Sequence, residues 1–130
     1  MYNAARSFEI AWKEGRTKEA GIWYTRALIN VRGGNMVTSI KTLNLILSDF
    51  KEQLSSEEQL VVYHNLGLSH EILLKKTKVP KHQKEHYSKA KMAYQTALRI
   101  SPGHIKTTNR LQLGARVVME QKTEIRKNKL

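Results

Sequence analysis

Apolar residues recur every three or four positions along almost the whole chain, and this spacing constrains the fold more than any other feature. No stretch alternates strictly between apolar and polar residues, as a half-buried strand would. Glycine and proline interrupt the pattern at Gly15, at Gly33 and Gly34, at Pro80 and at Pro102, and such residues end or begin helices. The sequence therefore predicts an all-α fold. The six expected helices cover residues 2–14, 17–31, 36–53, 56–76, 82–100 and 104–125.

The chain has 130 residues, about the length of one ordinary domain. We expect a single helical domain over residues 1–125 and a basic, frayed tail over residues 126–130. Ser55 and Ser56, followed by Glu58, predict an N-cap at the start of the fourth helix.

The positive charge is concentrated in the second part of the chain. Residues 1–74 contain eight Lys or Arg and eight Asp or Glu, whereas residues 75–130 contain fifteen and three, which accounts for the net charge of +12. An acidic peptide, a nucleic acid or an anionic lipid surface would be attracted to this part. A solvated basic face that only aids solubility explains the same pattern equally well.

The composition excludes several classes of protein. Without cysteine the chain has no disulfide framework, no thiolate zinc site and no cysteine nucleophile, which fits a reducing cytoplasm. Residues 1–15 carry charges within their apolar spacing, unlike a signal peptide, and no stretch reaches the roughly 20 apolar residues that cross a bilayer. We therefore expect a cytoplasmic protein without a membrane span.

One part of the chain has a recognisable repeat pattern, Tyr63-x2-Leu66-Gly67-x2-His70 followed by Ala90-x3-Tyr94-x2-Ala97-Leu98-x-Ile100-x-Pro102. This order and spacing resembles a tetratricopeptide repeat (TPR), and the resemblance covers residues 60–112. It implies stacked antiparallel helical hairpins, a TPR-like solenoid, in which small residues let helices approach closely, tyrosines fill the space between hairpins and a proline ends the second helix. The packing residues that it assigns are Tyr63, Leu66, Gly67, Ala90, Tyr94, Ala97 and Pro102.

The pattern departs from the family in the length of this hairpin. Residues 67 and 90 lie eleven positions further apart than usual, which is about three helical turns, so both helices can lengthen with their faces in register. The basic segment 75–84 would then project beyond the stack.

The pairing of the first helices stays open. Ala20, Tyr24 and Ala27 match the second helix of a hairpin, although counting helices makes theirs a first helix. The alternative pairs Trp23 and Ala27 with residues Ser39, Leu43 and Ile46 of the next helix. Either pairing gives about three hairpins, close to the minimum for a stable array, with an exposed end through which a homodimer could form.

The resemblance also implies a binding site. TPR arrays hold peptides or partner proteins in a concave groove lined by the first helix of each hairpin, and one subset clamps acidic C-terminal peptides with asparagine and basic side chains. Asn65, Lys106 and Arg110 fit the spacing of that clamp, and the two basic residues are four apart on one helical face. Arg99 and Arg116 are expected as peripheral cations.

The clamp is incomplete, because the first helix offers Tyr2 and Arg6 where the subset needs lysine and asparagine. The alternative for Lys106 and Arg110 is a solvated pair on the helix surface. In both cases their replacement by alanine is expected to leave the fold and its melting curve unchanged.

A histidine motif suggests metal chemistry at first sight. His82-Gln83-Lys84-Glu85-His86 matches H-x-x-E-H, which places two zinc ligands and a general base on one helical turn. Five nearby lysines oppose a divalent cation, so we expect exposed histidines at a helix start. His64 and His70 are expected as hydrogen-bonded packing residues. With no phosphate loop or nucleophile elbow, the sequence predicts no enzyme, no cofactor and no metal site.

The sequence therefore favours a non-enzymatic adapter or scaffold that binds a protein or peptide, preferably an acidic one. The alternative is non-specific nucleic-acid binding through the basic C-terminal part. Lysine outnumbers arginine eleven to four in residues 75–130, which favours loose electrostatic contact over base readout.

Overall fold

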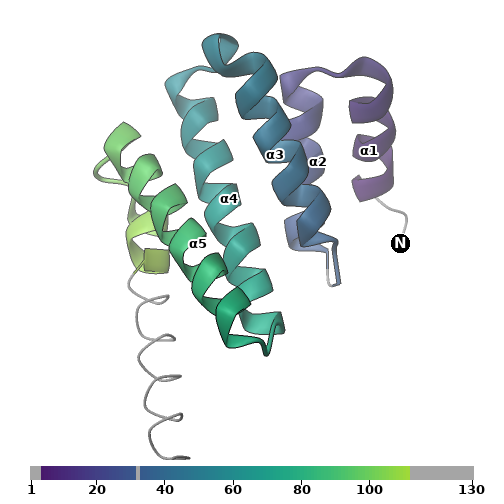
Figure 1. The fold of residues 1–130 in the computed structure, drawn as a ribbon. Coiled ribbons are helices and arrows are strands. Elements are labelled where there is room, and N and C mark those ends of the chain that lie inside the picture. Colours follow the sequence, from purple (N-terminus) through teal and green to yellow (C-terminus); the bar gives the residue numbers. More distant parts are fainter. Residues whose placement is uncertain (1–3, 32, 112–130) are drawn as a thin grey trace, which may run out of the picture.

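Helices joined by short turns make up the computed structural model, which describes residues 4–31 and 33–111 (Figure 1). No strand occurs in these residues, so the predicted all-α class is confirmed. A further helix comprises residues 105–111 of the described part. The elements before it are α1 Ala4–Gly15, α2 Lys18–Asn30, α3 Met36–Phe50, the 3-10 helix η1 Lys51–Gln53, α4 Ser56–Lys76 and α5 Pro80–Ile100.

The starts of the two longest helices follow from local chemistry. At α4 the Ser55 hydroxyl accepts from the Glu58 backbone N–H at 3.1 Å, while the Ser55 N–H donates to the Glu58 carboxylate at 3.0 Å. This reciprocal capping box confirms the predicted N-cap. α5 begins at Pro80, two residues before the predicted start, because proline at the first helical position lacks only an N–H that would have no intrahelical partner.

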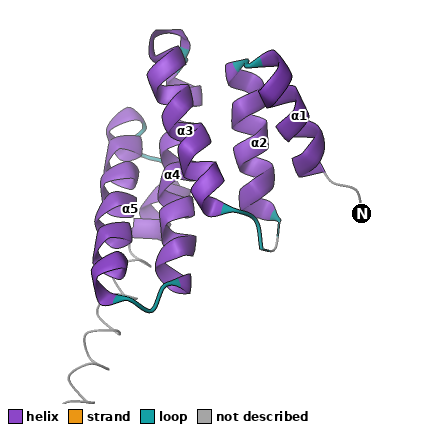
Figure 2. Ribbon diagram, turned by 45° about the vertical axis from the view of Figure 1, so that its right-hand side comes forward, coloured by secondary structure: helices purple, strands orange, loops and turns teal. Residues whose placement is uncertain are grey.

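From α1 to α5 each α-helix packs against the next α-helix along the chain, and α2 also packs directly against α4. The α2–α4 contact includes an ion pair of 2.7 Å between Lys18 and Glu58. In Figure 1, α3 lies in front of α2, and α5 lies in front of residues 105–111; Figure 2 shows the same helices turned by 45°. α2, α4 and residues 105–111 therefore form one layer, which agrees with the second of the two pairings left open by the sequence.

Two glycines allow helices to approach closely. A Cβ at Gly67 of α4 would overlap the ring of Tyr94 on α5, and a Cβ at Gly21 of α2 would lie 2.7 Å from Ile46 and 2.9 Å from Trp12. Both contacts leave no room for even a methyl group. Gly21 lies three residues before Tyr24, as Gly67 lies three residues before His70.

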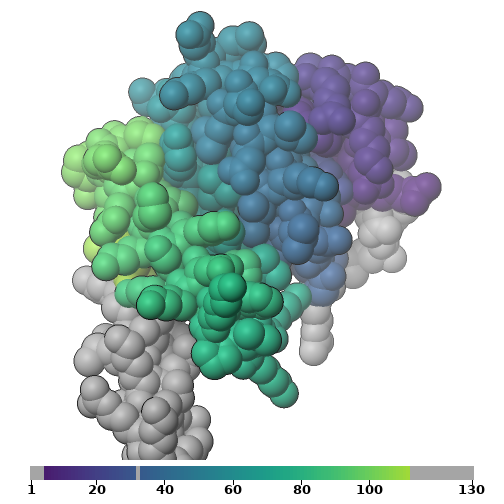
Figure 3. All heavy atoms as spheres, in the orientation of Figure 1, coloured from purple at the N-terminus to yellow at the C-terminus, as the bar shows by residue number. Residues whose placement is uncertain are grey.

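Apolar side chains from α1 to α5 form the core beside these contacts. Leu43, Ile46 and Val62 are fully buried, and a buried hydrogen bond of 2.8 Å joins the hydroxyls of Ser39 on α3 and Ser69 on α4. Figure 3 shows α3, α4 and α5 in contact along one face of the molecule. In the part of the chain that the structure describes, no helix is both long and apolar enough to span a bilayer.

Most residues assigned to repeat packing lie in this interior. Leu66, Gly67, Ala90, Tyr94 and Ala97 are buried, Tyr63 is half-buried, and Pro102 is exposed in the turn after α5. Tyr94 packs inside the α4–α5 hairpin against Gly67, whereas the sequence analysis expected it between hairpins. α4 and α5 have 21 residues each, and α2 and α3 have 13 and 15, so the extra length of this hairpin is helical.

We expect Gly67→Ala to lower the free energy of unfolding by about 2 kcal/mol, because the new methyl group displaces the Tyr94 ring from the α4 backbone. Gly15→Ala is the matched control, since a Cβ there meets nothing within 4 Å and alanine favours the last turn of α1. Urea denaturation followed by circular dichroism measures both. Equal stability of the two variants would contradict the close contact.

Candidate functional site

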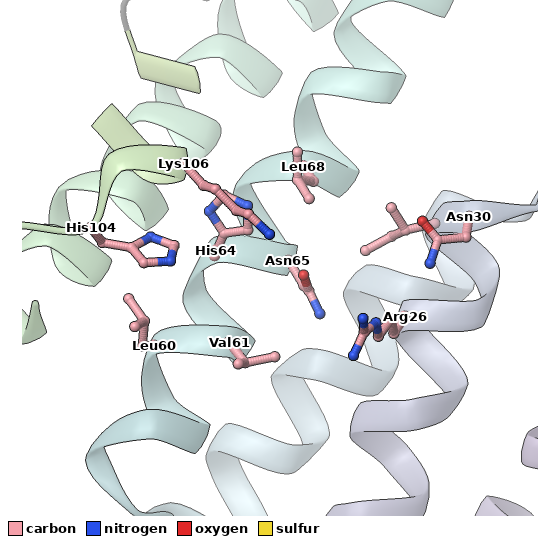
Figure 4. A pocket seen from close by; sticks show the side chains of 10 residues that line it. Arg26, Asn30, Leu60, Val61, His64, Asn65, Leu68, His104 and Lys106 are labelled. Atoms are coloured by element: carbon pink, nitrogen blue, oxygen red, sulfur yellow. The ribbon is translucent and has the colours of Figure 1, made fainter. Parts of the chain in front are cut away.

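A cavity of about 410 Å³ opens between α2, α4 and the turn and helix that follow α5 (Figure 4). We call it the central cavity. Its walls come from three segments that are far apart in the sequence but adjacent in the layer of α2, α4 and residues 105–111. The lining residues are Arg26, Ile29, Asn30, Leu60, Val61, His64, Asn65, Leu68, His104 and Lys106.

Asn65 is the most unusual residue of this cavity. Its side chain extends from α4 into the space facing α2 (Figure 4). The residue is only 8% exposed, and its amide nitrogen is buried without a hydrogen-bond partner. A buried donor without an acceptor costs about 1–3 kcal/mol, so the amide nitrogen of Asn65 is unfavourable for stability at this position.

The charged residues of the central cavity are all cationic. Arg26 on α2 and Lys106 lie on opposite walls, with Asn65 on the α4 wall between them (Figure 4). No acidic side chain lines the cavity among the described residues, and none of the ion pairs there involves Arg26 or Lys106. The cavity can therefore offer two positive charges and an amide donor to an anionic, acceptor-rich ligand.

Two histidines and a threonine hold the wall that carries Lys106. The fully buried hydroxyl of Thr107 hydrogen-bonds to Nδ1 of His64 at 2.9 Å and to Nδ1 of His104 at 2.6 Å. A hydroxyl has one proton to donate, so one of the two histidines must supply an N–H to Thr107. Burial, then the positive charges of His104, Arg110 and Lys106, lower the pKa of His64 to about 4. His64 is therefore neutral at neutral pH.

Arg110 does not join Asn65 and Lys106 in the central cavity. Its guanidinium forms an ion pair of 2.5 Å with Glu71 of α4, a carboxylate that is only 4% exposed. The Tyr94 hydroxyl lies near this pair, and burial together with the charge of Glu71 raises its pKa. Arg110 was predicted to be an exposed residue of the groove. It instead neutralises the buried Glu71 and fastens residues 105–111 to α4.

The other predicted site residues lie elsewhere. Arg99 is exposed on α5, where it donates to the Thr96 hydroxyl at 3.0 Å, and it does not line the central cavity. Arg116 lies outside the described residues, as does Tyr2. Of the four predicted binding residues that the structure describes, only Asn65 and Lys106 lie together in the central cavity.

One histidine of the H-x-x-E-H motif takes part in a hydrogen bond between two helices. His86 of α5 hydrogen-bonds to His70 of α4, with 3.1 Å between the two Nδ1 atoms. Burial, then the charges of His86 and Lys89, lower the pKa of His70 to about 4. Within residues 4–31 and 33–111, no three His, Cys, Asp or Glu side chains lie where they could share a metal ion.

Sequence reasoning missed Arg26 and Asn30, which line the central cavity from α2. They lie four residues apart, and Trp23 precedes them by three and seven, so all three share one helical face. This signal was present in the sequence, but it points to the groove only if α2 is a first helix, which the spacing left undecided.

Comparison with known proteins assigns neither a family nor a function to the chain. No protein-family model, curated protein or solved structure matches the chain. The TPR resemblance of residues 60–112 therefore stays a prediction from the sequence, and a function must be argued from the cavity itself.

We expect Arg110→Ala to lower the free energy of unfolding by about 2–3 kcal/mol, because it leaves the Glu71 carboxylate buried without a cation. Lys106→Ala, on the same helix but exposed, is the control and should change stability by less than about 0.5 kcal/mol. Adding Glu71→Gln to Arg110→Ala should recover part of the loss. A melting curve of Arg110→Ala that coincides with the wild type would exclude this structural role.

The free energy of unfolding should also fall as the pH drops from about 6.5 to 4. The unfolded chain binds protons at the ordinary histidine pKa, while His70 in the folded protein stays neutral until about pH 4. The stabilisation is therefore complete above pH 6.5 and lost through this window, by roughly 3 kcal/mol for His70. Urea titrations at several pH values should give a shallower loss for His70→Gln than for the wild type. Parallel curves would contradict the lowered pKa.

Proposed function

We propose that the protein is a non-enzymatic binding module that holds an acidic peptide segment of a partner protein in the central cavity. The observation that carries this proposal is the buried, unpartnered amide of Asn65 between two cationic walls. The TPR resemblance agrees with it, because it assigns Asn65 and Lys106 to a peptide groove. Arg26 replaces Arg110 as the second cation of that groove.

The side-chain amide nitrogen of Asn65 has no hydrogen-bond acceptor among the described residues. A leucine of similar volume would remove the cost of the unpartnered donor and fit the apolar neighbours Leu60, Val61 and Leu68. An amide at this position is therefore unfavourable for stability, and it becomes favourable when a ligand supplies a carboxylate or a carbonyl oxygen. Residues that lower stability in the free protein are typical of binding sites.

The charges restrict the ligand. Arg26 and Lys106 attract a carboxylate, and with no acidic residue in the lining of the described cavity, a basic ligand gains nothing there. An open cavity of about 410 Å³ holds a few residues of a peptide. An acidic side chain or a terminal carboxylate, with the adjacent backbone carbonyl, matches these donors.

The test is a selection of random twelve-residue peptides displayed on phage against the immobilised wild-type protein at pH 7 and physiological salt. We expect enrichment of Asp and Glu. A synthetic peptide of the selected sequence should bind about tenfold more weakly to Lys106→Ala, to Arg26→Ala and to Asn65→Leu, because each variant removes one donor. Asn65→Leu should have an equal or higher melting temperature.

Lys91→Ala is the matched control, since Lys91 is exposed on α5 and does not line the central cavity. Its peptide affinity should equal that of the wild type. Selected peptides without acidic enrichment, or an Asn65→Leu variant that binds as tightly as the wild type, would overturn the proposal.

A second candidate is non-specific nucleic-acid binding, and one observation favours it. The exposed side of α5 carries Lys81, Lys84, Lys91 and Arg99 within one narrow arc of the helix. Such a row of cations can contact the phosphates of a nucleic acid. Affinity capture from a lysate with and without nuclease distinguishes the two functions, because nucleic acid on the beads should disappear steeply with salt. Capture of nucleic acid by the wild type, lost in a Lys81→Ala, Lys84→Ala and Lys91→Ala variant, would favour this second function.

A further inference from the structure

A second cavity of about 240 Å³ adjoins the central cavity. It is lined by Phe8, Trp23, Arg26, Ala27, Asn30 and Val31, and we call it the Trp23 pocket. Arg26 and Asn30 also line the central cavity, so the two cavities share a wall on α2. A single ligand can therefore occupy both.

The Trp23 pocket is apolar and open. Trp23 is 48% exposed although its ring stacks on Phe8 of α1, with 5.8 Å between the ring centroids and 17° between the planes. Val31, the C-cap residue of α2, is exposed as well. Large apolar surfaces held rigidly in the open are favourable anchors, because a bound side chain buries them with little loss of conformational freedom.

Arg26 connects the apolar pocket with the cationic cavity. Its guanidinium carbon lies 5.2 Å from the centroid of the Trp23 ring, within the range of a cation–π contact. This contact holds the positive charge at the border of the two cavities. Arg26 and Asn30 line both cavities and lie one helical turn apart, so about two to three extended residues of a peptide reach from one cavity to the other.

We infer that the ligand carries a large apolar side chain, Trp, Phe, Leu or Met, about two to three residues from its acidic group, and that the Trp23 pocket binds this side chain. This inference rests on the proposed function and deepens it. The acidic group lies at Asn65 and Lys106, the backbone passes Arg26 and Asn30, and the apolar side chain packs on Trp23 and Val31. The partner is thus an acidic segment with one apolar anchor.

The experiment uses the full chain and phage-displayed peptides in which one central position is fixed as Glu and all others are random. Against the wild type we expect one apolar position, two or three residues from the Glu, to be enriched. Against Trp23→Ala and Val31→Ser that enrichment should vanish while further acidic residues stay enriched. Val31→Ser leaves the Arg26–Trp23 contact in place, so it separates loss of the pocket from displacement of Arg26.

Affinities measured with the selected synthetic peptide make the test quantitative. Replacing its apolar residue by alanine should weaken binding to the wild type at least tenfold and binding to Trp23→Ala less than twofold. Met92→Ala is the matched control, because Met92 is exposed on α5 and lines neither cavity. It should bind like the wild type.

The outcomes separate the two proposals. Acidic enrichment without a preferred apolar position would overturn the Trp23 inference and leave the proposed function standing. Apolar enrichment that survives in both Trp23→Ala and Val31→Ser would also overturn it. Absence of acidic enrichment from a fully random library would overturn the proposed function and this inference with it. A dimer in sedimentation velocity that Trp23→Ala abolishes would show that a second copy covers the pocket, and would likewise overturn the inference.

Discussion

The packing of the Tyr94 ring on the bare backbone of Gly67 is the contact on which the layer of α2, α4 and residues 105–111 depends. It allows α5 to lie close to α4 along the longest interface of the fold. Tyr94 is 1% exposed, with His64 on one side and the Glu71–Arg110 pair near its hydroxyl. The Glu71–Arg110 pair fastens residues 105–111 to α4. The position of Lys106 in the central cavity therefore depends on an ion pair whose residues do not line that cavity.

The positively charged side chains fall into two groups, those that form ion pairs within the fold and those that do not. Positive charges that lie near acids hold the fold together, as Lys18 does with Glu58 and Arg110 with Glu71. The cations that line the central cavity or the outer side of α5 form no ion pair within the described residues. The net charge of the C-terminal part therefore says little by itself, because Arg110 is structural whereas Arg99 is exposed.

The helices were predictable from the sequence because their signals are local. Glycine, proline and capping residues lie within a few positions of the ends that they determine, and the predicted boundaries of residues 56–76 agree with α4. The start of α5 was placed two residues late, because proline was treated as a break although it suits the first helical position.

The candidate site was predictable only in part, because its contacts are not local. Asn65 and Lys106 followed from their spacing in the repeat pattern. Arg110 did not, since its partner Glu71 lies 39 residues away and spacing within one helix cannot reveal it. Arg26 and Trp23 could be assigned to the site only if the layer to which α2 belongs was known. Both pairings satisfied the spacing, and the direct contact between α2 and α4 in three dimensions favours the pairing of α2 with α3.

The engagement of Arg110 with Glu71 leaves a lysine and the Trp23-bound Arg26 as the cations of the cavity. A lysine ammonium is a compact charge on a flexible stem, without the planar fork by which arginine fixes the angle of a carboxylate. Lys106 can follow a carboxylate over a range of approach directions. For an acidic ligand of the kind proposed, the angle of the carboxylate at Lys106 would be loosely defined, and the shape of the walls would contribute most to discrimination.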